Sequence, residues 1–204
     1  KRRTFLFELL SFSGEFDRAL KQLDVLAQAG PQTEMGTLIY RAAIQAELQR
    51  QEMFRSRDFP EPVPDQAAST AGTLNGKPFE SLEDADPRLG PRLEVFAAGR
   101  YIWVSFAHIA DIRISPPKTL RDLLWVPAVV RLGPGMKGKD LGHVLLPALA
   151  PLSALHPDES VRLGRQTVWV EEEGNAFPLG QKLLVVDGEE VPLLEVREVQ
   201  LGGA

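Results

Sequence analysis

The segment at residues 182–191 reads KLLVVDGEEV and sets the fold class of the C-terminal part of the chain. Asp187-Gly188 between two apolar runs is typical of a tight hairpin, because both central residues of such a turn favour positive φ. A second hairpin is predicted around Ala98-Gly99, between residues 93–96 and 101–106. Further short β-rich runs lie at residues 109–114, 128–132, 141–146 and 167–171. Several short strands with turns between them predict a small barrel or a strongly twisted antiparallel sheet.

The first 58 residues have a helical pattern instead. Apolar residues recur at three- and four-residue steps from Phe5 to Ala27, which is the period of an amphipathic helix. Gly30-Pro31 is expected to end the second helix. A third helix is predicted from about Thr33, its N-cap, to Phe54. Its inward residues are predicted to be Leu38, Ile39, Ala42, Ala43 and Ala46.

Between these two parts, periodicity is lost. Pro60, Pro62 and Pro64 alternate and an Ala/Ser-rich run follows, a composition that favours an extended connector. The chain is therefore predicted to be an α+β protein with a helical segment at 1–58, a Pro/Ala-rich linker at 59–78 and a mostly β domain at 79–204.

Composition excludes several classes of protein. The 204 residues carry 23 Lys+Arg and 28 Asp+Glu, a net charge of −5, whereas nucleic-acid binding needs a clustered basic face. No cysteine is present, which excludes disulfides and thiolate metal sites. No apolar run approaches the ~20 residues of a membrane span. A soluble, cytoplasmic protein is expected, and the opening Lys1-Arg2 without an initiator Met suggests that further helices precede it.

A phosphate-binding loop is suggested by residues 133–140, which fit G-x-x-x-x-G-K. However, Asp140 stands where Ser or Thr would ligate Mg²⁺, and the residues that follow have a strand pattern rather than a helical one. An exposed hairpin turn is the preferred interpretation.

Asp84 and Asp86 suggest a metal-binding or acid–base pair, but Pro87 and Gly90-Pro91 indicate a turn in which Asp caps the backbone. The histidines have no zinc-type spacing, and no Gly-x-Ser-x-Gly elbow occurs. No metal, cofactor or small-molecule substrate is therefore predicted. An enzyme that uses Asp84, Asp86 and His108 stays open as a remote alternative.

Other conspicuous side chains have structural interpretations. Trp103, Trp125 and Trp169 are expected in the core of the β domain. Arg121-Asp122 is expected to form an ion pair that fixes a loop, and residues 171–173, all Glu, a solvated strand end.

The helical segment matches tetratricopeptide spacing at Gly14-x-Phe16-x-x-Ala19-x-x-x-Leu23. In that interpretation small Gly14 and Ala19 let two antiparallel helices approach, and one such pair needs upstream helices to bury its apolar face. Helical arrays of this kind bind a peptide or helix in a groove. The candidate partner-binding residues are Phe12, Tyr40, Ile44 and Leu48.

Five segments together resemble the ImpE/TagJ family of type VI secretion accessory proteins. They are LEDADPRLGPRLE at 82–94, GRYIWV at 99–104, PKTLRDLLWVPA at 117–128, RLGRQT at 162–167 and VPLLEVR at 191–197. The family motif positions are Asp84, Asp86, Pro87, Gly90, Pro91, Trp103, Arg121, Asp122 and Trp125.

The resemblance implies a non-enzymatic accessory protein of the contractile secretion apparatus. Its implied partners are the small sheath subunit TssB and the disassembly ATPase ClpV, with an influence on sheath assembly or recycling. A truncated tetratricopeptide-like array is also implied, because family members carry more N-terminal helices. A generic peptide-binding adaptor outside secretion remains the alternative.

Overall fold

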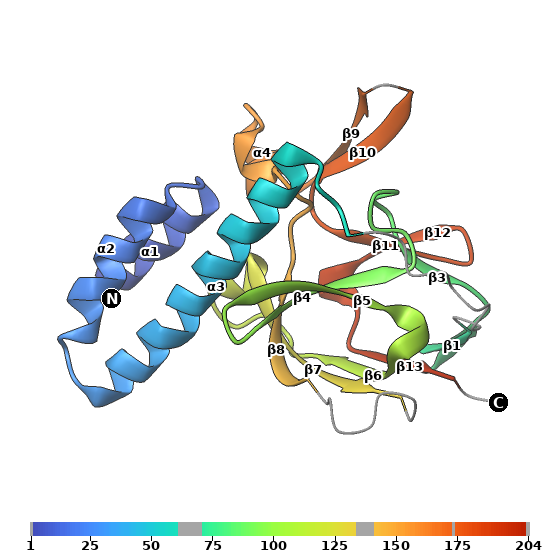
Figure 1. Ribbon diagram of the computed structural model, residues 1–204, viewed down its shortest axis with the longest axis horizontal. Helices are drawn as coiled ribbons and strands as arrows, with labels where there is room; N and C mark the ends of the chain where they lie inside the picture. Colours follow the sequence, from blue (N-terminus) through green and yellow to red (C-terminus); the bar gives the residue numbers. More distant parts are fainter. Residues whose placement is uncertain (1, 61–70, 134–140, 173, 203–204) are drawn as a thin grey trace.

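The structure, a computed structural model, describes residues 2–60, 71–133, 141–172 and 174–202 and confirms an α+β protein (Figure 1). The described chain opens with helices α1 (Arg2–Phe12), α2 (Phe16–Ala27) and α3 (Pro31–Ser56), which lie beside a mostly β body. Among the described residues, none of the helices combines the length and apolar character that a membrane span needs.

Helix α3 begins earlier than the sequence suggested. Gly30 is its N-cap, with φ of 134°, and Pro31 occupies the first turn, where a missing N–H costs nothing. The predicted N-cap Thr33 therefore lies inside the helix. Pro31 opens α3 rather than closing α2, which already ends at Ala27.

The buried side of α3 also differs from the prediction. Ala43 and Ala46 are buried as expected, but Leu38 and Ile39 are each more than half exposed. The residues that α3 buries are Ala43, Ile44, Ala46, Glu47, Arg50, Gln51 and Phe54, together with Thr37. The apolar pattern pointed to the wrong face because much of the buried face is polar.

The tetratricopeptide-like packing of α1 and α2 stays a prediction, and one part of its logic fails. Ala19 is fully buried, as a close helix contact requires. Gly14, however, lies in the turn between α1 and α2 with φ of 73°, and a Cβ there would meet Ala154 of the short helix at 153–155, not α1 or α2. Gly14 is thus a turn residue and not a helix-packing residue.

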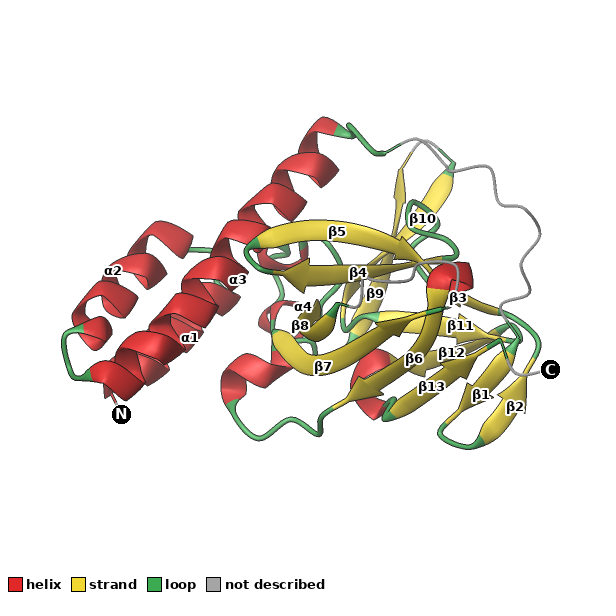
Figure 2. Ribbon diagram, turned by 60° about the horizontal axis from the view of Figure 1, so that its bottom comes forward, coloured by secondary structure: helices red, strands yellow, loops and turns green. Residues whose placement is uncertain are grey.

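The described strands include an eight-stranded antiparallel sheet of order β2-β1-β13-β6-β7-β8-β4-β5 (Figure 2). Its edge strands β2 and β5 do not pair with each other in the described chain, so the sheet is open and the barrel alternative is wrong. Its strands are β1 (Gly72–Leu74), β2 (Lys77–Phe79), β4 (Arg92–Ala97), β5 (Arg100–Ser105), β6 (Ile109–Ile114), β7 (Trp125–Leu132), β8 (Gly142–Pro147) and β13 (Glu198–Leu201).

Two smaller sheets complete the β body. One has the order β12-β11-β3 and the other is the ribbon β9–β10. Their strands are β3 (Leu82–Asp84), β9 (Thr167–Glu172), β10 (Asn175–Gly180), β11 (Leu183–Val186) and β12 (Glu189–Pro192). The short helices are η1 (Phe106–His108), η2 (Leu120–Leu123), η4 (Ser153–Leu155), α4 (Glu159–Arg162) and η5 (Leu193–Glu195).

Both predicted hairpins are confirmed. Ala98-Gly99 joins β4 to β5 and Asp187-Gly188 joins β11 to β12, and all four turn residues have positive φ. A third hairpin was missed: Asn75-Gly76 joins β1 to β2 inside the range predicted as linker. Residues 72–79 therefore belong to the sheet. Residues 61–70, residues 134–140 of the expected hairpin turn, and residue 173 lie outside the described residues.

Two apolar clusters form the core. One lies within the β body, and the other is shared by the helices and the sheet, for example by Phe7, Ile44, Phe96 and Trp125. Trp125 is fully buried and Trp103 packs against the shared cluster. The third tryptophan, Trp169, is 43% exposed, so the prediction that it is a core residue is wrong.

Gly72→Ala tests the missed hairpin. A Cβ at Gly72 would lie 1.9 Å from the Gln200 carbonyl oxygen, so β1 and β13 must separate. We expect a loss of about 1–3 kcal/mol in the free energy of unfolding, measured by urea titration. The control is Gly36→Ala in α3, where a Cβ meets nothing within 4 Å. It should stabilise the protein by about 0.5–1 kcal/mol. Equal effects of the two substitutions would contradict the β1–β13 pairing.

Candidate functional site

Four charged side chains are buried where α3 meets the β body. Arg50 of α3 donates from Nε and Nη2 to the two carboxylate oxygens of Glu94 on β4, at 2.6 and 2.9 Å. Lys182, just before β11, forms ion pairs with Glu94 and with Asp84 of β3. All four are at most 3% exposed. We call these four residues the buried charge network.

Neighbouring polar groups extend the network. The Tyr101 hydroxyl donates to Glu94 at 2.6 Å, and Trp103 Nε1 donates in turn to the Tyr101 oxygen. Arg50 Nη2 also donates to the Leu149 carbonyl oxygen at 2.8 Å. Because these groups come from α3, β4, β5 and the segment after β8, the network fixes how the helix docks on the sheet.

Electrostatics keep the network ionised near neutral pH. Burial alone would raise the pKa of Glu94, but Arg50 and then Lys182 lower it to about 2. Burial raises the pKa of Asp84 to about 6, against the attraction of Lys182. Within the buried charge network two carboxylates offset two cations, and a further buried carboxylate, that of Glu47, lies 3.4 Å from Arg50 Nη1. None of these groups is exposed enough to meet a substrate.

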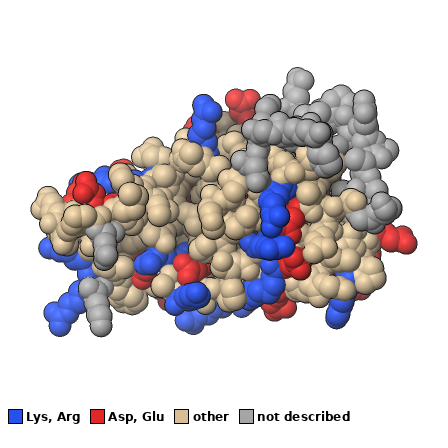
Figure 3. Space-filling view, turned by 90° about the horizontal axis from the view of Figure 1, so that it is seen from below, with Lys and Arg blue, Asp and Glu red and all other residues tan. Residues whose placement is uncertain are grey.

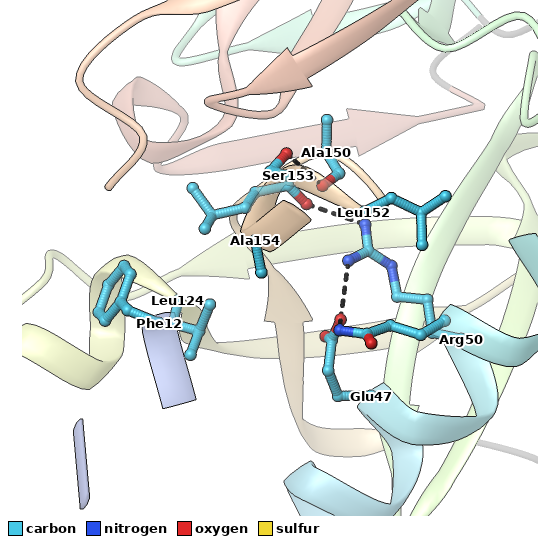
Figure 4. A pocket seen from close by; sticks show the side chains of 10 residues that line it. Phe12, Glu47, Arg50, Leu124, Ala150, Leu152, Ser153 and Ala154 are labelled. Carbon is cyan, nitrogen blue, oxygen red and sulfur yellow. Dashed lines mark hydrogen bonds and ion pairs between the residues drawn. The ribbon is translucent and has the colours of Figure 1, made fainter. Parts of the chain in front are cut away.

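Beside the network lies a small cavity (Figure 4). The Arg50 guanidinium and the Glu47 carboxylate project toward it from α3, opposite Ser153 and the apolar side chains of Phe12 and Leu124. Burial also raises the pKa of Glu47. The cavity volume of ≈ 20 Å³ suits about one water molecule and not a substrate.

The candidate catalytic residues do not share a pocket. Asp84 belongs to the buried charge network, and Asp86 instead accepts two bonds from the Arg88 guanidinium, at 2.8 and 2.6 Å. His108 is exposed on η1. No group of three or more His, Asp or Glu in the described chain could hold a metal ion.

The other motif residues have structural positions. Pro87, Gly90 and Pro91 form the loop between β3 and β4, where Gly90 has φ of 56° and its N–H closes a turn on the Asp86 carbonyl. Trp103 lies beside Tyr101 in the extended network.

The predicted Arg121–Asp122 pair does not form. Arg121 binds Glu8 of α1 at 2.9 Å and donates to the Tyr40 hydroxyl at 2.6 Å. Asp122 caps η2 by accepting the N–H groups of Lys118 and Thr119. The pairing differs because a carboxylate in the first turn of a helix satisfies backbone donors.

The predicted partner-binding residues are divided between core and surface. Phe12 and Ile44 are buried, and Tyr40 stacks on Trp125 with ring centroids 6.4 Å apart. Leu48 is 36% exposed. Other apolar residues are exposed but were not predicted to bind a partner. They include Met35, Leu38 and Ile39 on α3 and Phe5, Leu6 and Leu9 on α1. Their helical spacing in the sequence predicts an apolar helix face, but it does not tell whether that face is buried in the core or exposed to a partner.

Charged side chains are mixed on the face seen from below. Lys and Arg lie next to Asp and Glu over the β body, and broad uncharged areas adjoin them (Figure 3). On the large sheet, Arg113 pairs with Asp111 and Glu198, and Arg131 pairs with Asp111. This face therefore has the alternating charges of a solvated sheet and not a one-sign basic patch.

The fold defines the class of the protein: helices docked by a buried charge network on an open antiparallel sheet. The ImpE protein family model matches residues 76–200, more than half of the chain. A relative from Pseudomonas aeruginosa PAO1, "Type VI secretion system accessory component TagJ", is 33% identical over 229 residues, covering 97% of this chain and 79% of the relative. The chain belongs to the ImpE family.

The crystal structure of VPA1032 from Vibrio parahaemolyticus has the same fold. It superposes with a TM-score of 0.83 at 21% identity, covering 99% of this chain and 86% of that one. The arrangement of helices and sheet therefore recurs in a solved structure.

Asp84→Asn tests the electrostatics of the network. The folded-state pKa of about 6 lies above the ordinary 3.8, so the folded protein binds this proton more tightly. The contribution of Asp84 to stability is then complete below about pH 4 and is lost as pH rises to about 6. The unfolding free energy of the wild type minus that of Asp84→Asn should fall by about 2 kcal/mol between pH 4 and pH 6, measured by urea titration.

Asp187→Asn is the control of opposite sign. Asp187 accepts the N–H groups of Ser81 and Glu80, which lower its pKa. Its contribution should therefore be present above its ordinary pKa and be lost as pH falls. The network would be contradicted if the difference in unfolding free energy between the wild type and Asp84→Asn stayed constant or rose between pH 4 and pH 6.

Proposed function

We propose that this protein is a non-enzymatic accessory adaptor of the bacterial type VI secretion system, working in the cytoplasm. Its partner is the small sheath subunit TssB, with the ClpV ATPase as a second partner, and it influences sheath assembly or recycling. Membership of the ImpE family and 33% identity to an accessory component of that system support the role. The observation that carries the binding mode is an uncovered apolar stripe on α3.

The stripe consists of Met35, Leu38 and Ile39, which are 63%, 54% and 51% exposed. Their i, i+3, i+4 spacing places them on one side of the helix. Three adjacent apolar side chains exposed to this degree are typical of a surface that binds a partner. Leu48 is 36% exposed on the same helix, but it lies nine residues beyond Ile39, about 180° around the helix axis, and is not part of the stripe.

The stripe is uncovered because α3 is longer than the surface it docks on. Its C-terminal half contacts β4 and β5, whereas its N-terminal half extends past the sheet beside α2 (Figure 1). Helix α2 packs on one side of this half, where Arg41 forms an exposed ion pair with Asp24. The remaining side offers an apolar strip on which a short amphipathic helix of the sheath subunit would lie.

The geometry gives no comparable support to an enzyme. Asp84 and Asp86 are each neutralised by their own cation, and His108 lies apart on the surface. The cavity beside Arg50 has room for about one water molecule. Binding without chemistry is thus the function that the described residues favour.

The double variant Leu38→Asp/Ile39→Asp tests the stripe. We expect roughly tenfold or greater loss of affinity for a peptide from the N-terminus of the sheath subunit, measured by isothermal titration calorimetry, because two charges would be desolvated on binding. Leu48→Asp, on another side of α3, should leave the affinity close to that of the wild type.

Leu155→Asp is the matched control, since Leu155 is 64% exposed on η4 and lies off α3. Its affinity should equal that of the wild type. Unchanged binding by the double variant would reject the stripe as the binding surface. If the sheath subunit does not bind the unmodified full-length protein, the adaptor role in secretion is rejected. A peptide-binding adaptor outside secretion then becomes the better proposal.

A further inference from the structure

The β9–β10 ribbon stands clear of the two larger sheets (Figure 1). It is nevertheless firmly attached. The Thr167 hydroxyl donates to the Gln181 carbonyl oxygen at 2.8 Å at its base, and the Arg88 guanidinium lies 4.2 Å from the centre of the Phe177 ring. Arg57 pairs with Glu172 near the tip. A held ribbon presents its outer edges in one orientation.

The register shows which backbone groups of β9 point outward. Gln181 N–H donates to the Gln166 carbonyl, which makes that pair a hydrogen-bonded one. In an antiparallel ladder such pairs alternate with non-hydrogen-bonded pairs. Trp169, opposite Pro178, and Glu171, opposite Ala176, fall at the non-hydrogen-bonded positions. The N–H and C=O groups of Trp169 and Glu171 therefore face away from β10.

The two edges of the ribbon are not equivalent. On β10, the outward position opposite Trp169 is Pro178, which has no N–H to donate. Proline at such a position blocks the addition of another strand. On β9 the outward residues Trp169 and Glu171 keep their N–H groups, and no described residue is hydrogen-bonded to them from outside the ribbon. One edge is closed and the other is open.

The side chains at the open edge favour a cationic ligand. Trp169 is 43% exposed, and Glu171, two residues further on, lies on the same face of the strand and is exposed as well. An indole ring attracts Lys or Arg through its π face, and the carboxylate adds charge attraction. The net charge of −5 opposes self-pairing of two copies through this acidic strand.

We propose that the outer edge of β9 binds an extended Lys/Arg-bearing segment of a partner protein, which adds to the ribbon as a third strand. Backbone groups of Trp169 and Glu171 pair with the segment, and a basic side chain of the segment lies over Trp169 beside the Glu171 carboxylate. This surface is separate from the apolar stripe of α3, so it extends the adaptor to a second binding mode.

The probe is a fluorescein-labelled peptide in which lysine alternates with valine and threonine, titrated against the whole chain at physiological salt and followed by anisotropy. We expect saturable binding, and little binding of the same peptide with glutamate in place of lysine. Trp169→Ala should weaken binding roughly fivefold or more. Binding that is absent, or indifferent to Trp169, would overturn the proposal.

Two substitutions at one position separate strand addition from charge attraction. Glu171→Gln keeps the outward N–H and should weaken binding roughly two- to threefold. Glu171→Pro also removes that N–H, as Pro178 does on β10, and should weaken binding roughly tenfold or more. Thermal unfolding of both variants checks that each is folded, and Glu190→Gln on β12 is the control for net charge. Equal affinities of the two Glu171 variants, or a dimer formed through β9 in sedimentation, would overturn strand addition.

Discussion

The docking of α3 on the β body depends on the bidentate pairing of Arg50 with Glu94. The two residues are 44 positions apart in sequence, and Lys182, 88 positions from Glu94, completes the neutralisation. Desolvating each ion costs of the order of several kcal/mol, which is repaid only when every charge has its partner in good geometry. A slip of β4 by one residue would turn Glu94 to the opposite face and leave Arg50 buried without a partner. The network thus selects one register and one helix orientation.

The same constraint explains the exposed stripe of α3. Turning the helix to bury Leu38 and Ile39 would withdraw Arg50 from Glu94 and leave the Glu94 carboxylate buried without this partner. Burying two such apolar side chains is worth about 3–6 kcal/mol at most, whereas breaking a buried pair costs about 3–5 kcal/mol and also forfeits the packing of Ile44 and Phe54. The pairing of Arg50 with Glu94 therefore leaves the apolar stripe exposed in the described chain.

Sequence reasoning succeeded where the signal was local. Ala98-Gly99 and Asp187-Gly188 mark their hairpins because the turns need positive φ at both residues. Asn75-Gly76 carries the same signal, but the proline-rich run before it predicts an extended linker, so this hairpin was missed. Lys182 could not be recognised, since a lysine beside an apolar strand is normally solvated and its partners Asp84 and Glu94 are distant in sequence. Trp169 gave no sign of exposure, because alternation alone does not distinguish a free ribbon from a strand of a packed sheet.

The motif carboxylates acquire distinct structural roles from this arrangement. Asp84 holds Lys182 in the buried charge network, whereas Asp86 holds the Arg88 guanidinium, which lies 4.7 Å from the ring centre of Phe54 on α3 and 4.2 Å from that of Phe177 on β10. A planar cation between two rings, fixed by a bidentate carboxylate, joins the end of α3 to the ribbon. The exposed Arg57–Glu172 pair adds little to this link. Because Arg50 and the Phe54–Arg88 contact both lie in the C-terminal part of α3, the orientation of the ribbon is linked to that of the helix that carries the α3 stripe.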